Sequence, residues 1–362
     1  MSAMAAWITD HDLAFWTIAI GVVGNVSCAV LGCYLVLRRL SLLGDAISHA
    51  VLPGLVLAFL FSGQTTVWPM SLGARAMGVL TAFLTQTVHG FGKVPEDASM
   101  GVVFTGLFAI GVVLITRYGP NLHIDADCVL YGMIELAPLD TVPVAGIEVP
   151  RAMWPLTLAL AATLLFTTLF WKELKLAAFD PLLATSIGVS ALLMHYLLMG
   201  MVAAVTVAAF ESVGSILVIA MLIVPAAAAQ LLADRLVWMM VWAALIAAMS
   251  SVLGYFGAVY FDTSVAGMMA VAAGGQFAVT LCFAPRHGLV SKAATNLALG
   301  VRIVSEDIVA FLFRGEELAR DRSISWRFCV RALGAVALIA LPRLWRQGQI
   351  EFASGGHVQL TD

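Results

Sequence analysis

The chain has 362 residues, of which 61% are hydrophobic and only 11% are charged, and its formal net charge is −3. Soluble domains average roughly 25% charged and 45–50% apolar residues, so this composition excludes an ordinary soluble protein. It predicts an all-α protein whose helices cross a membrane several times.

Nine apolar runs approach the length of about 20 residues that a helix needs to cross a bilayer. A polar stretch at 118–152 separates the fourth run from the fifth. If that stretch holds a re-entrant or interfacial piece, the count falls, so we expect eight to nine transmembrane helices. The runs cover residues 13–37, 41–61, 70–91, 98–116, 154–171, 183–200, 203–232, 237–259 and 264–284.

Basic residues between these runs gather on one side of the predicted membrane when the N-terminus is placed outside. Cytoplasmic loops carry an excess of Lys and Arg, so this pattern predicts an N-terminus outside and a C-terminus in the cytoplasm. The residues on the cytoplasmic side are then Arg38, Arg39, Lys93, Lys172, Lys175, Arg235, Arg286 and Lys292, against Arg75, Arg117 and Arg151 near the other side.

Asp45 and His49 lie inside the second apolar run. Because they are four residues apart, a helix stacks both side chains on one face. A carboxylate and an imidazole are costly in hydrocarbon unless they pair or hold an ion. Their oxygen and nitrogen atoms together suit a divalent transition metal such as Mn, Fe or Zn. The pair is therefore our candidate metal site, and a hydrogen-bonded pair that only stabilises the helix is the alternative.

Four stretches, taken in order and spacing, carry a resemblance to a known family. They are RRLSLLGDAISHAVLPG at 38–54, EDASMGVVF at 96–104, AAFDP at 177–181 with Ala184 and Gly188 downstream, and ESVGSILVIAMLIVPAAAA at 211–229. Over residues 13 to about 285 the chain resembles the membrane subunit of bacterial ABC importers for manganese, zinc and iron, the family-3 metal permeases.

The resemblance implies a transmembrane permease domain at 1–285 in the bacterial inner membrane. It implies three partners: a second permease protomer, identical or closely related, a cytoplasmic ABC ATPase subunit, and a periplasmic or lipid-anchored metal-binding protein. It also implies alternating access, in which the transported Mn²⁺, Zn²⁺ or Fe²⁺ passes between the two protomers. Manganese is the favoured ion, and no permanently bound cofactor is expected.

The resemblance also assigns residues. The family's metal ligands match Asp45 and His49. Its coupling helix, which contacts the ATPase, matches about 179–188, with Phe179, Asp180, Ala184 and Gly188 at the matching positions. The chain has no Walker A pattern, so it is not expected to be an enzyme, and ATP is expected to bind and be hydrolysed on the partner subunit.

Glu211 and His195 are weaker site candidates, as gate residues or as residues that support the metal ligands. The plainer interpretations are a water-facing carboxylate at the opening of the seventh run and a packed histidine in the sixth. His123, Asp125 and Asp127 are metal-ligand types in an outside loop, which commonly carries such residues without an ion.

Rival functions stay open at this point. One is a permease of the same architecture for a chelated metal or another small solute. Another is a stand-alone secondary metal transporter, which would need no ATPase partner. A membrane-tethered transcription regulator is a third, and it would require the C-terminal tail to bind DNA.

The tail at 286–362 holds ten basic and seven acidic residues, whereas residues 1–285 hold nine and fifteen. Some family members carry a cytoplasmic winged-helix-like extension, and the tail resembles it weakly, with helical stretches at 292–314 and 323–341 and a hairpin within 355–361. Because the tail's charge is a modest +3 and it is tethered to a membrane, we expect a docking or regulatory module, with nucleic acid an unlikely partner. A tenth membrane element at 332–341 is the alternative.

Overall fold

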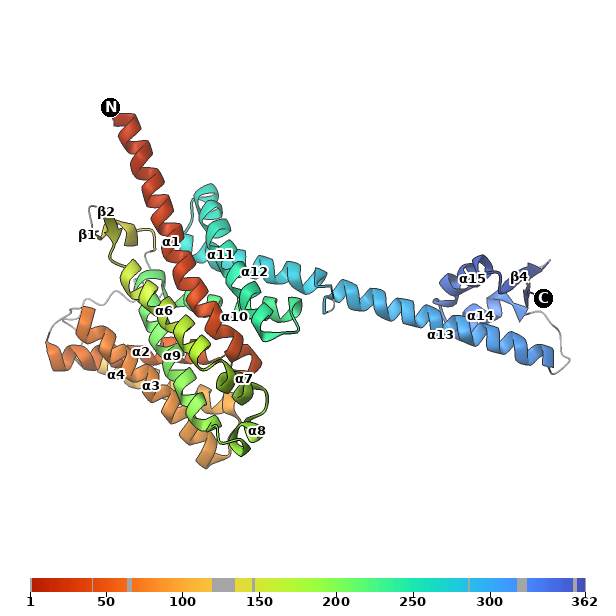
Figure 1. The fold of residues 1–362 in the computed structure, drawn as a ribbon, viewed down its shortest axis with the longest axis horizontal. Helices are drawn as coiled ribbons and strands as arrows, with labels where there is room; N and C mark the ends of the chain where they lie inside the picture. Colours follow the sequence, from red (N-terminus) through yellow and green to blue (C-terminus); the bar gives the residue numbers. More distant parts are fainter. Residues whose placement is uncertain are drawn as a thin grey trace. The chain divides into compact units, whose positions relative to one another are not determined.

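Figure 1 shows the fold as a computed structural model. It describes residues 2–40, 42–63, 67–118, 134–144, 147–285, 287–317, 324–353 and 357–361. The chain divides into two compact units, Met1–Thr280 and Leu281–Asp362, and each is described here by itself.

Long helices build the first unit, with one short hairpin. The helices are α1 (Ser2–Leu37), α2 (Leu43–Ser62), α3 (Val67–Gly92), α4 (Glu96–Tyr118), α6 (Met153–Leu169), α7 (Trp171–Phe179), α8 (Pro181–Ser186), α9 (Ala191–Val213), α10 (Ser215–Leu232), α11 (Leu236–Phe261) and α12 (Val265–Phe283). In Figure 1, α2, α3 and α4 form one group and α1 packs beside α10 and α11.

Within the described residues, seven helices are long and apolar enough to cross a bilayer. The pair α6 and α7, bent by 75° at its break, makes eight if it is counted as one span. Helix α3 is not among them. The expected all-α fold with several membrane spans is confirmed.

Two predicted boundaries are wrong. The sequence divides the apolar region into spans at 183–200 and 203–232, whereas α9 continues unbroken to Val213. The break falls at Gly214, whose φ of +86° lies in the region that favours glycine. Hydropathy does not detect this break, because the few polar residues beside it, Glu211, Ser212 and Ser215, do not interrupt the long apolar run. The predicted start at 183 is also wrong, since α8 is a separate helix before α9.

Small residues let the helices of this unit approach one another closely, which is how helices associate in lipid. A Cβ atom on Gly54 of α2 would stand 2.5 Å from the carbonyl oxygen of Gly73 in α3, and the reverse substitution meets the carbonyl of Gly54. A Cβ atom on Gly32 of α1 would collide with the carbonyl of Leu222 in α10. These crossings fix α2 against α3 and α1 against α10.

An antiparallel hairpin, which the sequence analysis did not predict, precedes α6. Its strands are β1 (Thr141–Val144) and β2 (Ile147–Pro150), and they follow the 3₁₀ turn η1 (Ala137–Leu139). Just before η1, the carboxylate of Glu135 accepts a hydrogen bond of 2.6 Å from the amide of Val265, the first residue of α12. His123, Asp125 and Asp127 lie outside the described residues.

The second unit contains α13 (Leu289–Glu317), β3 (Ile324–Ser325), α14 (Trp326–Leu333), α15 (Ala337–Arg346), β4 (Ile350–Ala353) and β5 (His357–Leu360). Its strands form an antiparallel sheet in the order β3, β5, β4. Its core joins Val301, Ile308 and Leu312 of α13 to Cys329 of α14 and to Leu341 and Leu344 of α15.

Two expectations for this tail are wrong in detail. The helix expected at 323–341 is two helices, because Gly334 at φ +80° separates α14 from α15. The hairpin begins at Ile350, earlier than the expected 355, because β4 pairs with β5. Residues 332–341 are shared between α14 and α15, and neither helix is among the candidate spans. The winged helix stays a prediction.

Candidate functional site

The corner between α1 and α2 places the candidate metal pair. Helix α1 ends with two tightening hydrogen bonds, from the amide of Leu40 to the carbonyl of Leu35 and from Arg39 to Val36. Arg39 takes a φ of +61°, the left-handed conformation that closes this type of helix end. The chain then turns directly into α2, so Asp45 falls in the first turn of that helix.

Asp45 and His49 lie on one face of α2, as the spacing predicts. His49 Nε2 is 3.4 Å from Asp45 Oδ1, and the two side chains keep 38% and 42% of their surface exposed. A pair in contact that still opens to its surroundings can bind an ion without first breaking up a buried network.

Aromatic residues of α4 line the His49 ring on two sides. The ring stacks on Phe104, with centroids 5.8 Å apart, and meets Phe108 edge to face at 5.4 Å. These contacts fix the orientation of the imidazole. Pro53, one turn further along α2, has no amide hydrogen, so the carbonyl of His49 lacks its usual helical donor.

One chain supplies too few ligands for full coordination at this place. Among the described residues, no group of three or more His, Cys, Asp or Glu side chains is close enough to hold a metal ion. Transition metals in proteins commonly take four to six ligands. A metal ion at Asp45 and His49 would therefore need ligands beyond the described residues of this chain.

The segment expected to contact an ATPase is a short, well-anchored helix. Asp180 caps α8, since its Oδ1 accepts a hydrogen bond of 3.0 Å from the amide of Leu183, and Pro181 starts the helix. Helix α8 ends at Ser186, and Gly188, with a φ of +94°, turns the chain two residues later. Ala184 is fully buried in a small cluster with Ala177 of α7 and Met194 of α9. Of the four predicted positions, three therefore shape and seat the helix.

Exposed apolar side chains cover the other side of this segment. Phe179 is 61% exposed, as its assignment to a contact surface requires. The sequence analysis missed Leu182 and Ile187, which are 85% and 64% exposed. Helical spacing gives no signal for Ile187, because at 100° per residue it falls only about 60° around the helix from the buried Ala184.

His195 lies beside this segment. Arg38, just past the end of α1, reaches His195 Nδ1 of α9 at 3.3 Å through one guanidinium nitrogen. Through the other it donates a bond of 3.0 Å to the carbonyl of Ala177 in α7. Arg38 thus connects His195 of α9 to the α7–α8 segment. Arg38 itself was missed, although its position after an apolar run marked it as interfacial.

Glu211 falls in the last turn of α9, three residues before the break at Gly214, and not at the opening of a span. Its role as a gate stays a prediction.

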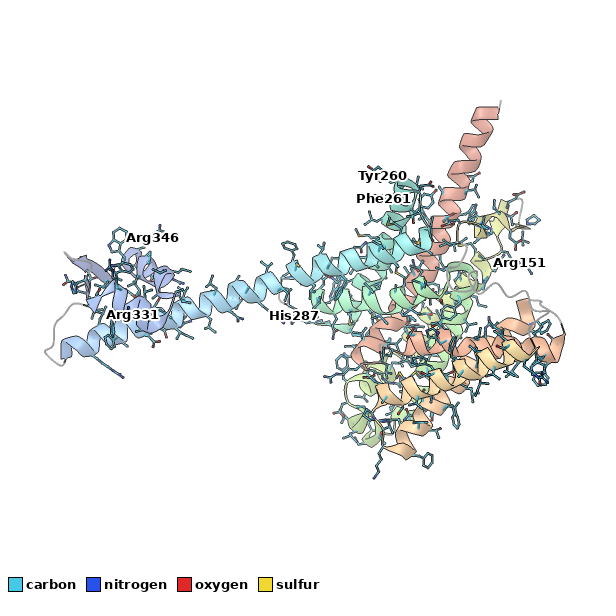
Figure 2. The ribbon with its side chains drawn as sticks, turned by 180° about the vertical axis from the view of Figure 1, so that it is seen from behind. Arg151, Tyr260, Phe261, His287, Arg331 and Arg346 are labelled. Carbon is cyan, nitrogen blue, oxygen red and sulfur yellow. The ribbon has the colours of Figure 1, made fainter. Side chains whose placement is uncertain are left out.

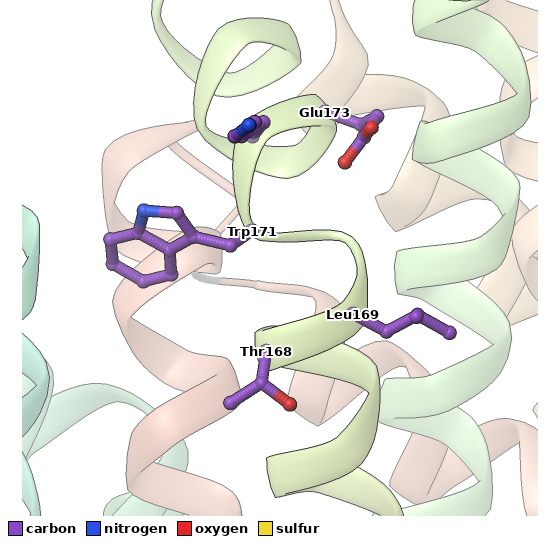
Figure 3. Close-up of a pocket in the computed structure, with 5 residues that line it drawn as sticks. Thr168, Leu169, Trp171 and Glu173 are labelled. Atoms are coloured by element: carbon purple, nitrogen blue, oxygen red, sulfur yellow. The ribbon is translucent and has the colours of Figure 1, made fainter.

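The break between α6 and α7 forms a shallow surface hollow. Figure 3 shows Thr168 and Leu169 at the end of α6 and Trp171 and Glu173 at the start of α7. The bend of 75° redirects the chain toward α8. Its lining holds one carboxylate and one amine, so it offers no set of metal ligands.

Comparison with known proteins shows which family this chain belongs to. The model of the ABC 3 transport family matches residues 10–284 of the chain. The chain belongs to the ABC 3 transport family. The manganese transport system membrane protein MntD of Bacillus subtilis is 47% identical over 283 residues, which is 78% of this chain and 96% of that protein. The zinc transport system membrane protein TroD of Treponema pallidum is 44% identical over 282 residues, which is 78% of this chain and 77% of that protein.

A solved structure with a similar fold agrees with the ABC 3 match. PsaBC from Streptococcus pneumoniae in complex with Fab is 32% identical, with a TM-score of 0.62, covering 75% of this chain and 92% of that chain. The resemblance drawn from the four sequence stretches is therefore confirmed: this is a multi-pass membrane permease of a bacterial ABC 3 transporter, a transport subunit.

Proposed function

We propose that this permease imports a divalent transition metal, with Mn²⁺ favoured and Zn²⁺ or Fe²⁺ as alternatives. The ion passes between two protomers, past Asp45 and His49 of each. The exposed Asp45–His49 pair on α2 is the observation that carries this proposal.

The incomplete coordination supports transport over storage. A carrier must release its ion, and the two ligands of one chain alone bind it more weakly than a closed site with four or more. A second protomer would bring another carboxylate and another imidazole to the same ion. We therefore assign Asp45 and His49 as ligands that close only in the dimer.

The energy comes from a partner in this proposal. Leu182 of α8 and Ile187, just after the helix, are exposed, and they form the kind of apolar contact surface that a docking helix needs. A cytoplasmic ABC ATPase binds there, and its ATP cycle moves α7, α8 and α9 to switch the permease between outward and inward access. A periplasmic or lipid-anchored protein delivers the metal, the N-terminus lies outside, and the C-terminus lies in the cytoplasm.

The choice of metal rests on more than the ligand pair. Intrinsic affinity rises from Mn²⁺ to Zn²⁺ for any oxygen and nitrogen site, so Asp45 and His49 alone favour Zn²⁺. Relatives are named for both ions, with a manganese system at 47% identity and a zinc system at 44%. We favour Mn²⁺ because the more similar of these two is named for it, with selectivity supplied by the delivery protein.

Uptake of radiolabelled Mn²⁺ and Zn²⁺ by cells carrying the complete transporter tests the proposal. We expect Asp45→Ala and His49→Ala each to lower uptake by more than about 10-fold, since even residues that only support metal ligands are worth that much. Ser48→Ala is the matched control, because the hydrogen bond described for the Ser48 hydroxyl, 2.7 Å long, goes to the backbone carbonyl of Asp45 and not to either ligand side chain.

The same cells separate the rival functions. Normal uptake by Asp45→Ala protein, at normal membrane levels, would show that the cargo is chelated or is another solute. Uptake that continues without any ATPase subunit would identify a secondary transporter instead.

A further inference from the structure

Helix α15 of the second unit has two different faces. Ala337, Ala340, Leu341 and Leu344 are buried and join the core of the unit. The residues between them point outward along one side of the helix, because they fall within about half a turn at 100° per residue. This outward face of α15 consists of Leu338, Ile339, Pro342, Arg343, Trp345 and Arg346, all exposed.

The outward face combines large apolar side chains with positive charge. Leu338, Ile339 and Trp345 are 50–57% exposed, and Arg343 and Arg346 occupy the last turn. Figure 2 marks Arg346 on α15 and Arg331 on α14 in this unit. From 324 to 350 the chain has four arginines, including Arg327, and no acidic residue. The occupant of this face is therefore expected to be apolar in part and negatively charged.

We propose that the outward face of α15 binds an anionic phospholipid surface. Amphipathic helices that lie in a membrane interface place aliphatic residues and Trp in the acyl boundary and Arg among the headgroup phosphates. The outward face of α15 has this composition. Its two arginines would meet phosphates while Leu338, Ile339 and Trp345 enter the boundary.

The tether to the membrane supports this occupant. Helix α12, a candidate span, ends at Phe283, and α13 begins at Leu289. The first α13 residue in the core of the second unit is Val301, about 18 Å further along the helix at 1.5 Å per residue. A unit on so short a tether experiences a high local concentration of lipid headgroups, so even weak affinity suffices.

Two other occupants fit less well. A second copy of the same face would bring Arg343 and Arg346 against their own equivalents, and like charges in contact are destabilising. A nucleic acid read by α15 would meet Leu338 and Ile339 at the start of the helix, and these side chains have no hydrogen-bonding groups for base edges.

Hydrogen exchange of the full-length protein in nanodiscs tests the proposal. Amide exchange at 337–346 is measured in phosphatidylcholine alone and in phosphatidylcholine with phosphatidylglycerol. We expect slower exchange in the anionic discs, with the difference shrinking at high salt. The double substitution Arg343→Glu and Arg346→Glu should remove this difference between the two lipids. Loss of two arginines near an anionic surface lowers the equilibrium constant for lipid binding about 30-fold.

Arg302→Glu with Arg314→Glu is the matched control, because it changes the net charge equally on α13. Equal exchange in the two lipids would overturn the proposal. So would protection in anionic discs that survives the Arg343 and Arg346 reversal. Protection of 337–346 by duplex DNA but not by lipid would identify a nucleic acid as the occupant and would also overturn it.

Discussion

Arg38 donates to a carbonyl at the end of α7 that has no helical donor, and its loss should loosen the α7–α8 segment. In a helix the carbonyl of Ala177 would accept from the amide four residues on, but that residue is Pro181, which has no amide hydrogen. Arg38 supplies the missing donor at 3.0 Å. The carbonyl also belongs to the last turn of α7, where a cation is favourable.

The magnitude follows from the burial of this carbonyl. Ala177 is 1% exposed, so in Arg38→Ala protein its carbonyl would be left unsatisfied in a buried place. Such a group costs about 1–3 kcal/mol, and the lost cation at the helix end adds about 0.3–1 kcal/mol. We therefore expect about 2 kcal/mol of local destabilisation, which raises the open population of α7 and α8 roughly 30-fold.

Hydrogen exchange of the purified permease measures this change. Amides at 176–189 should exchange roughly 30-fold faster in Arg38→Ala protein, and Arg38→Lys should restore most of the protection because lysine can also donate. Arg39→Ala removes the same charge one residue away and serves as the control. If Arg38→Ala and Arg39→Ala protein exchange equally at 176–189, the reasoning about the Ala177 carbonyl is wrong.

Four further predictions concern other parts of the chain. Asp180→Ala should cost about 1 kcal/mol of α8 stability and weaken ATPase binding in a pull-down titration, whereas Asp180→Asn should retain the cap. Leu182→Glu and Ile187→Glu should prevent ATPase binding without lowering membrane levels, with Thr185→Ala on the same helix as the control. Gly54→Leu should lower thermal stability in detergent by more than Gly274→Ala, which meets no atom within 4 Å, because the new side chain forces α2 off the Gly73 carbonyl. Burial raises the pKa of the Cys329 thiol, so alkylation of Cys329 in Cys282→Ser protein should be slow at neutral pH. Adding Leu344→Ala opens a cavity in the core cluster that contains Cys329, at a cost of about 2–5 kcal/mol, and should speed this alkylation.

The spacing of polar residues in apolar helices was readable from the sequence. Asp45 and His49 share a face because four residues make about one helical turn, and the structure brings them within 3.4 Å. Asp180 followed by Pro181 is likewise a local pattern that favours a helix start, and α8 begins there. Both inferences use local geometry, which a short stretch determines by itself.

Breaks and long-range contacts were harder to read. Gly214 and Gly334 end helices through a left-handed backbone, yet glycine is also common inside membrane helices, so hydropathy gave no sign of these ends. The contacts of Glu135 with Val265 and of Arg38 with Ala177 join residues 130 and 139 positions apart. Such pairs depend on how helices pack, which periodicity does not determine.

In the proposed mechanism, the transported ion is coordinated by His49. Pulsed electron paramagnetic resonance of Mn²⁺ held by the complete transporter, stalled by an ATPase that binds but does not hydrolyse ATP, tests it directly. We expect nitrogen coupling from imidazole in the wild-type spectrum and its loss in His49→Gln protein. Nitrogen coupling that persists in His49→Gln protein would show that the ion does not bind His49 and lies elsewhere.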